Sequence, residues 1–134
     1  MVETRPLPRL DADNRAFWTG GAEGELRIHH CNACGSFNHP PAPVCRKCLS
    51  EDVAPRAVSG RAVIDSYTVN HQAWAPGQQV PYVIARVALD DAPGVILTTN
   101  IVNCPPDEVD IGDRVRVLFE QHGEIFVPLF EKAA

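Results

Sequence analysis

Two Cys-x-x-Cys pairs constrain this chain more than any other feature of its sequence. The first pair is Cys31 and Cys34, and the second is Cys45 and Cys48. A turn of this spacing directs two thiolates toward one point, so two facing turns supply the four sulfur ligands of a tetrahedral structural zinc site. With four sulfur ligands, no position is left for water or substrate. The pattern predicts a zinc ion that stabilises a fold and performs no chemistry; iron in the same sulfur cage or a disulfide is the alternative.

The surroundings of the cysteines favour the metal. A thioredoxin-like redox motif has one such pair at the mouth of a βαβ unit, whereas here two pairs occur with no helical pattern between them. A disulfide framework needs an oxidising compartment, yet the first residues contain no apolar signal-peptide core and the count of 5 cysteines is odd. His29, His30 and His39 lie close by in the sequence. Because four cysteines make a histidine ligand unnecessary, we expect these histidines to line a strand or the surface.

Composition narrows the class of protein. The 134 residues are 45% hydrophobic, which is typical of a globular chain, and 12 prolines with 9 glycines interrupt short segments, which favours a mainly β protein. No apolar run approaches the ~18 residues that span a bilayer, so we expect no membrane contact and a cytoplasmic location. The net charge of −5 argues against a protein whose main task is binding phosphate backbones.

The segment before the first cysteine predicts one short helix and one strand. Residues 1–10 are proline-rich and should cover a surface or stay loose. A helix through residues 14–18 is expected, with Asp11 or Asp13 as its cap and the glycine pair 20–21 as its end. Leu26 and Ile28 then alternate with polar residues in a strand over 25–30. Phe17 and Trp18 either pack on the zinc module or anchor another chain, and internal packing is favoured because so short a helix must bury its aromatic residues.

After Asp52 the pattern changes to five extended runs. The first is long enough to be a curved strand with a bulge at Gly60. The second and third form a hairpin across residues 90–94, and a turn-rich connection over 104–113 precedes a last hairpin. This is the strand plan of a partly open Greek-key barrel of the OB type. The expected strands are 57–69, 82–89, 95–102, 114–120 and 125–130.

These elements predict three parts of the chain. Residues 1–24 form an N-terminal segment with the short helix, residues 25–54 form the zinc ribbon, and residues 55–134 form the OB-fold domain. The core of the ribbon is too small to be stable without its metal.

The order of the motifs resembles that of a known family. The chain resembles the bacterial and archaeal acyl-CoA-associated proteins in a series of motifs. In chain order these are Phe17-Trp18, Gly24-Glu25-Leu26, Cys-x-x-Cys-Gly, Pro40-Pro41-x-Pro43-x-Cys45-x-x-Cys48 and Ser59-Gly60-Arg61-Ala62, followed by the later runs 81–89, 111–115 and 127–130. In that family a rubredoxin-like zinc ribbon precedes an OB-fold domain. The chain departs from the family where Arg46-Lys47 replaces a frequent proline and where Leu49 replaces the commoner glycine.

The resemblance implies a companion subunit. Members of the family assemble with thiolase-fold enzymes, namely thiolases, acyltransferases and retro-aldolases, and help to stabilise them or to shape their acyl-CoA entrance. A hetero-oligomer with such an enzyme is therefore expected, with acyl-CoA possible at the shared interface and little turnover by this chain alone. Phe17, Trp18 and residues 127–130 are candidate interface anchors. Coenzyme A carries phosphates, and the candidate contacts are the local cations Arg46, Lys47, Arg56 and Arg61.

The sequence gives less support to two other functions. Zinc ribbons and OB barrels often bind single-stranded nucleic acid, but only Tyr67, Trp74 and Tyr82 are available for base stacking and the net charge has the wrong sign. A free-standing enzyme would need a catalytic set, and Cys104, the one cysteine outside the predicted metal site, is followed by prolines and acids rather than a base. We therefore expect Cys104 to be structural.

Overall fold

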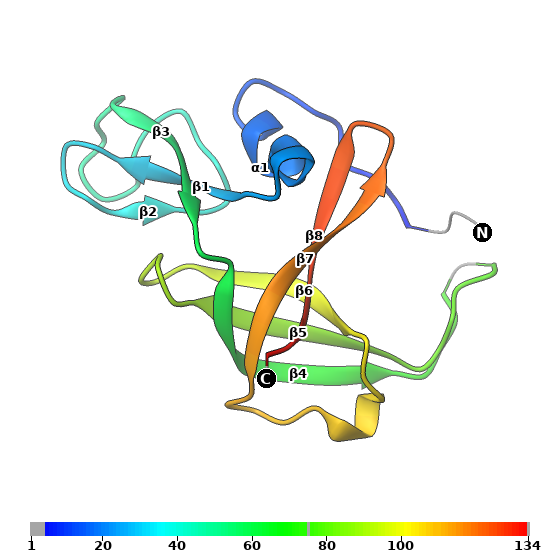
Figure 1. Ribbon diagram of the computed structural model, residues 1–134. Coiled ribbons are helices and arrows are strands. Elements are labelled where there is room, and N and C mark those ends of the chain that lie inside the picture. The colour runs from blue at the N-terminus through cyan, green and yellow to red at the C-terminus, as the bar shows by residue number, and fades with distance from the viewer. Residues whose placement is uncertain (1–4, 75, 134) are drawn as a thin grey trace.

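The computed structural model describes residues 5–74 and 76–133, so residues 1–4 of the expected N-terminal segment lie outside the described part. The described residues form a mainly β protein with one short α-helix, α1 (Arg15–Thr19), which continues into the 3-10 helix η1 (Gly20–Glu23). A three-stranded sheet and a five-stranded barrel follow (Figure 1). None of the described helices is long and apolar enough to cross a membrane.

The start of α1 differs in detail from the prediction, whereas its end agrees with it. The Asp11 carboxylate accepts the backbone N–H groups of Asp13 and Asn14 at 2.9 and 2.8 Å, but Asn14 occupies the N-cap position. The α-helix ends at Thr19 with Gly20 as its C-cap, as predicted, and the chain continues in the 3-10 helix η1 as far as Gly24, which has φ +71°. A Cβ at Gly21 would lie 2.4 Å from Cβ of Phe126. Gly21 therefore allows the backbone to approach the last hairpin closely, and Gly24 ends the 3-10 helix in a left-handed conformation.

The zinc-ribbon sheet has the order β2-β1-β3, with β1 (Leu26–Cys31) in the centre, β2 (Phe37–Asn38) and β3 (Val53–Val58). β1 pairs antiparallel with β3 from Leu26 opposite Val58 to Cys31 opposite Val53. The predicted single strand over 57–69 is therefore wrong, because its first residues belong to this sheet. The bulge predicted at Gly60 is also misplaced. Gly60 joins the two sheets, and the register shift of the next strand lies between Ile64 and Ser66.

The barrel has the strand order β4-β5-β6-β8-β7 and closes by pairing β7 with β4. Parallel pairing of β6 with β8 places Ile101 opposite Phe130, as an OB-fold barrel requires. The barrel is closed, whereas the sequence predicted a partly open one. The predicted β5–β6 hairpin and the final hairpin are confirmed. The bounds are β4 (Arg61–Asn70), β5 (Tyr82–Leu89), β6 (Ile96–Val102), the 3-10 helix η2 (Pro106–Glu108), β7 (Arg114–His122) and β8 (Ile125–Lys132).

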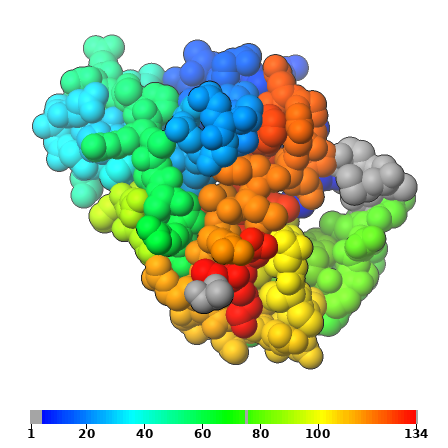
Figure 2. Space-filling model, in the orientation of Figure 1, coloured from blue at the N-terminus to red at the C-terminus, as the bar shows by residue number. Residues whose placement is uncertain are grey.

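One hydrophobic core connects the ribbon to the barrel. Phe17 from α1 and Leu26 and Ile28 from β1 belong to the same buried cluster as the barrel residue Phe130. In Figures 1 and 2 the helical segment fills the space between the ribbon sheet and the β7–β8 hairpin. Burying each such side chain stabilises the fold by about 1.5–3 kcal/mol, so the helix and the ribbon strand contribute to the stability of the barrel as well as to their own.

Candidate metal centre

The first cysteine turn begins where β1 ends. The N–H of Gly35 donates to the carbonyl of Cys31 at 2.8 Å, and the N–H of Cys31 donates to the carbonyl of Ser36 at 2.8 Å. Gly35 has φ +79°, which a residue without a Cβ adopts at low cost. These bonds curl the chain so that Cys31 and Cys34 point to the same side.

The second turn repeats this pattern. The N–H of Leu49 donates to the carbonyl of Cys45 at 3.0 Å, and the N–H of Cys45 donates to the carbonyl of Ser50 at 2.9 Å. Leu49 has φ +64° and occupies the place that Gly35 holds in the first turn. The two turns are therefore equivalent in backbone geometry and differ in the side chain at this position.

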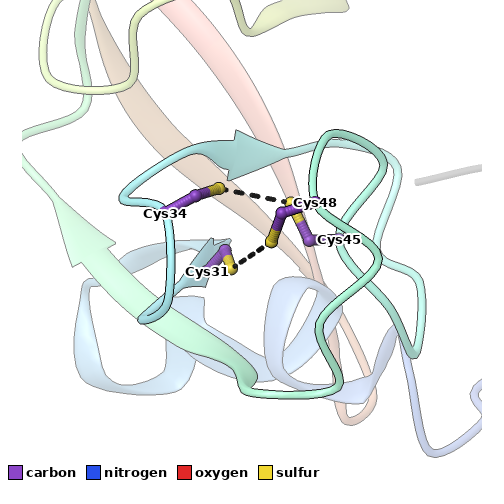
Figure 3. A group of neighbouring side chains, drawn as sticks. All are labelled: Cys31, Cys34, Cys45 and Cys48. Atoms are coloured by element: carbon purple, nitrogen blue, oxygen red, sulfur yellow. Dashed lines mark hydrogen bonds between the residues drawn. The ribbon is translucent and has the colours of Figure 1, made fainter.

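The four predicted cysteine sulfurs face one another (Figure 3). All four lie within 4.8 Å of one another. The Cys31 to Cys48 and Cys34 to Cys45 sulfur distances are both 3.6 Å. A disulfide would place two sulfurs about 2.05 Å apart, whereas a tetrahedron with Zn–S bonds of about 2.3 Å has edges of roughly 3.8 Å. The arrangement fits a four-sulfur metal site and does not fit a pair of disulfides.

Hydrogen bonds and neighbouring sulfurs shift the pKa values of the clustered thiols in opposite directions. The backbone N–H of Cys48 lowers the pKa of Cys45 to about 6, helped by other donors that include the Asn38 amide at 3.6 Å from the Cys45 sulfur. The backbone N–H of Ser50 favours the thiolate of Cys48, but the nearby sulfurs of Cys31, Cys34 and Cys45, with partial loss of hydration, outweigh it and raise the pKa of Cys48 to about 12. A bound divalent metal would require every thiolate and would therefore release protons on binding.

The neighbouring histidines are not part of the sulfur cluster. Among the described residues, the group of side chains close enough to share a metal consists of the four cysteines. His29 is buried on β1, and the His30 ring lies 3.2 Å from the Arg56 guanidinium and 3.3 Å from Asn32. His39 packs against Phe17 with ring centroids 4.8 Å apart. The prediction that these histidines line a strand or the surface agrees with His29 and His30 on β1, whereas His39 lies outside the strands and is half-buried.

The four cations suggested for coenzyme A lie in three separate places. Arg46 and Lys47 are exposed in the second cysteine turn, Arg56 is exposed on β3, and Arg61 begins β4 in the barrel. No hydrogen bond or ion pair among the described residues joins any two of them. Contact with coenzyme A stays a prediction.

The interface anchors suggested from sequence are largely internal. Phe17, Leu129 and Phe130 are 6%, 4% and 0% exposed, so they stabilise the core and are not available to another chain. Trp18 is half-buried and packs against both hydrophobic clusters. The interface assignment for the buried residues was therefore wrong, because the aromatic helix is covered by the protein's own last hairpin.

Cys104 also has a structural environment. It is half-buried and packs against the main core, and burial raises the pKa of its thiol. Lys132 offsets part of this rise, and Glu108 and Asp113 add to it. A thiol in this setting is a weak nucleophile, as the sequence indicated.

One feature of the surface has no specific signal in the sequence. A groove of about 790 Å³ lies between the N-terminal segment, α1, the loop before the second cysteine pair and the barrel strands β6 and β8. Arg5, Trp18, His39, Leu97 and Val127 are among its lining residues. The Arg5 guanidinium donates to Glu120 at 2.8 Å and to Asn100 at 3.1 Å, which fixes the N-terminal segment across the barrel. The proline-rich composition of residues 1–10 was the one available hint that this segment covers a surface.

Family models match both parts of the chain. The model described as the ChsH2 rubredoxin-like zinc ribbon domain matches residues 18–54, and the model described as the ChsH2 C-terminal OB-fold domain matches residues 55–120. A protein titled "Ltp2-ChsH2(DUF35) aldolase" has a solved structure that is 32% identical, with a TM-score of 0.85 over 96% of this chain and 100% of that one.

Three curated relatives are similar in sequence. A probable enoyl-CoA hydratase alpha subunit of Thermomonospora curvata is 37% identical over 131 residues. The 3-oxo-4,17-pregnadiene-20-carboxyl-CoA hydratase alpha subunit of Mycobacterium tuberculosis is 36% identical over 112 residues. This chain covers 96% and 84% of its own length in these matches but spans 40% and 35% of the two relatives. A DUF35 domain-containing scaffold protein of Methanothermobacter thermautotrophicus is 32% identical over 93 residues, which is 68% of each chain.

Proposed function

Because the chain belongs to the DUF35 family that includes ChsH2, we propose that it is a non-catalytic accessory subunit of an enzyme that acts on acyl-CoA thioesters. The observation that carries the proposal is the match, over 100% of its length, to the chain whose title joins Ltp2 and ChsH2(DUF35) in an aldolase. The names of two relatives, both hydratase alpha subunits with CoA substrates, support the same class of partner. The term scaffold in the name of the archaeal relative supports a role in assembly.

The partner in this proposal is a thiolase-fold subunit, and the complex is a hetero-oligomer. The protein stabilises that subunit or shapes its acyl-CoA entrance. The described cysteines favour an accessory role over catalysis. The sulfur cluster has no open ligand position, and burial raises the pKa of the Cys104 thiol.

The proposal includes a structural zinc ion held by Cys31, Cys34, Cys45 and Cys48. The sulfur spacing fits such an ion, and a closed shell of four thiolates supplies folding energy and no Lewis-acid chemistry toward a substrate. Within the protein, these residues fix the positions of the two turns relative to β1 and therefore relative to the shared core.

Co-expression with a thiolase-fold acyl-CoA enzyme subunit from the same organism tests the proposal. Size-exclusion chromatography with light scattering should show one complex that contains both chains, and thioester cleavage or condensation should require the enzyme subunit. This chain alone should not turn over acyl-CoA. A chain that stays monomeric beside that enzyme, or that processes acyl-CoA thioesters by itself, would show that the accessory role is wrong.

A single-stranded nucleic-acid-binding module is the alternative. Trp74 is 77% exposed and is the one observation that favours base stacking. However, the loop over 71–81 contains no lysine or arginine, Tyr67 and Tyr82 are half-buried, and the net charge is −5. Fluorescence anisotropy with a labelled single strand at about 150 mM salt should show no binding; tight binding with a steep salt dependence would favour this alternative.

A further inference from the structure

The first part of β6 pairs with a neighbouring strand on one side only. β5 lies along β6 from its first residue onward, whereas β8 pairs only with 101–102. The N–H of Leu89 on β5 donates to the carbonyl of Val95, and the direction of backbone groups alternates along a strand, so those of Ile96 and Thr98 point away from β5. Within the described part of the chain, no backbone hydrogen bond satisfies them on that side. Here β6 has a free edge.

This free edge forms one side of the groove of about 790 Å³ beside α1. Ile96 and Thr98 are among the lining residues, and Thr98 is exposed. The N-terminal segment, α1 and the prolines 40–41 bound the groove elsewhere. An unpaired row of N–H and C=O groups is complementary to an extended polypeptide, whose own backbone offers the matching groups at the same spacing. Because other segments bound the groove, such a polypeptide meets β6 as a single segment rather than as part of a wide sheet.

Two neighbouring edges are protected against such pairing, and this one is not. On β8, Pro128 has no N–H to donate, and its carbonyl accepts the Thr99 hydroxyl at 3.0 Å. On β3, the outer strand of the ribbon sheet, Pro55 interrupts the edge. The free edge of β6 instead carries isoleucine and threonine, which are uncharged and favour strands. Proteins commonly protect free edges with proline or charge, so the contrast favours an edge that is kept open for pairing.

Other occupants fit the edge less well. Arg5 is the one arginine or lysine among the described residues that line the groove, and its guanidinium is bound to Glu120 at 2.8 Å. The groove therefore offers little to the phosphates of coenzyme A or of a nucleic acid. The described strands of a second copy already belong to that copy's own ribbon sheet or barrel, so a second copy has no spare strand to offer. An extended segment of a different protein fits best.

We propose that an extended segment of the acyl-CoA enzyme subunit adds to the free edge of β6 as a further strand. The inference rests on the proposed function, which supplies the partner, and it names the surface at which the two subunits meet. The main-chain groups of Ile96 and Thr98 bind the backbone of the segment. The apolar side chains of Ile84 and Ile96 in the groove select its alternate residues.

Amide hydrogen exchange with residue-level resolution tests the pairing directly. In the complex with the purified thiolase-fold subunit, the Ile96 and Thr98 amides should exchange at least tenfold more slowly than in the free chain. Ala57 is the matched control. The N–H of Asn32 donates to the carbonyl of Asp52, so in the register of β1 and β3 the N–H of Ala57 points away from β1. Its exchange rate should change by less than twofold.

Substitutions at the edge test its contribution to affinity. Thr98→Pro removes an N–H that the fold does not use and places a ring in the path of the segment. Its Kd for the enzyme subunit should rise about tenfold or more, while Ala57→Pro, the same change on the β3 edge, should bind within twofold of wild type. Thr98→Lys adds a charge at an exposed position, as natural edges do, and should also weaken binding. It decides the matter if the proline variant fails to fold.

The outcomes separate this inference from the accessory role. If wild type binds the enzyme subunit, but the two amides keep their free rates and Thr98→Lys binds like wild type, strand addition is wrong and the accessory role stands. Protection of these amides in a concentrated solution of this chain alone would assign the edge to a second copy. Protection by coenzyme A without the enzyme would assign the groove to a small molecule, and either result would overturn the proposal. If wild type does not bind the subunit, both are wrong.

Discussion

Gly60 is the residue at which the chain leaves the ribbon sheet and enters the barrel. It has φ +78°, and its carbonyl accepts the N–H of Val117 at 2.9 Å. A Cβ at this position would lie 2.3 Å from Cγ1 of Val117. The glycine therefore allows both the left-handed backbone and the close contact that joins the two sheets.

Gly60→Ala should lower the free energy of unfolding by about 2–4 kcal/mol, because left-handed strain and overpacking add. Urea denaturation measures the change. Gly94→Ala is the matched control, since Gly94 has φ +85° but open space where a Cβ would lie, so only strain of about 1 kcal/mol is expected. Equal effects at the two glycines would show that the contact with Val117 is unimportant.

His39 should make stability depend on pH. Burial, with smaller effects from Arg46 and His29, lowers its pKa from 6.5 to about 4. The unfolded chain therefore binds more protons than the folded chain between these values, so stability is fully present above pH 6.5 and falls as the pH approaches 4. We expect a loss of about 2 kcal/mol between pH 7.5 and pH 5 from this group.

Urea unfolding of wild type and His39→Phe at several pH values measures this contribution. The variant keeps a ring against Phe17 and removes the titration, and both proteins contain the same cysteines, so the difference in pH dependence isolates His39. Parallel stability curves for the two proteins from pH 7.5 to pH 5 would contradict the prediction.

Among the strands, those with a clean alternation were predictable and those that depend on a partner were not. Val83, Ala85 and Val87 are buried every second residue, so β5 was predicted at its observed bounds. Apolar and polar residues also alternate from 57 to 69, but this pattern does not indicate which sheet each part of the segment joins. The break at Gly60 follows from the pairing of β3 with β1, a long-range contact that local pattern does not contain.

The same distinction applies to the candidate site. The spacing of the cysteines identified the sulfur cluster because each turn is local and repeats the other. The groove beside α1 is formed by segments far apart in the sequence, such as Arg5, His39 and Val127, so no local signal indicates it. The burial of Phe130 likewise depends on closure of the whole barrel.

Removal of the metal should destabilise the ribbon strands and, through them, the barrel. Leu26 and Ile28 on β1 are part of the common core, so Cys31→Ser or a strong chelator should lower the free energy of unfolding by about 3 kcal/mol or more. Metal analysis of wild type should find about one zinc per chain. Cys104→Ser, the same substitution outside the cluster, should change stability by less than about 1 kcal/mol and keep the metal. A metal-free protein with unchanged stability would contradict the structural role of zinc.

The ribbon, the helix and the barrel act as one folded unit because their apolar side chains share a core. Trp18 contacts the main cluster and also the smaller cluster of Ile125, Val127 and Leu129 on β8 of the last hairpin. Its indole therefore connects the two groups of apolar residues that hold the N-terminal helix on the barrel. A side chain in this position should affect the stability of the whole molecule more than it affects any one surface.

Trp18→Ala should lower the free energy of unfolding by about 3 kcal/mol, because it leaves a cavity between the two clusters. Trp74→Ala makes the same change at a tryptophan that is 77% exposed and should alter stability by less than about 0.5 kcal/mol. Binding of each folded variant to the enzyme subunit, measured well below its thermal midpoint, separates stability from assembly. If Trp18 is an internal connector, its variant binds with nearly wild-type affinity once folded. A Trp18→Ala variant of unchanged stability that no longer binds the enzyme subunit would instead make the indole an interface anchor and would contradict its internal role.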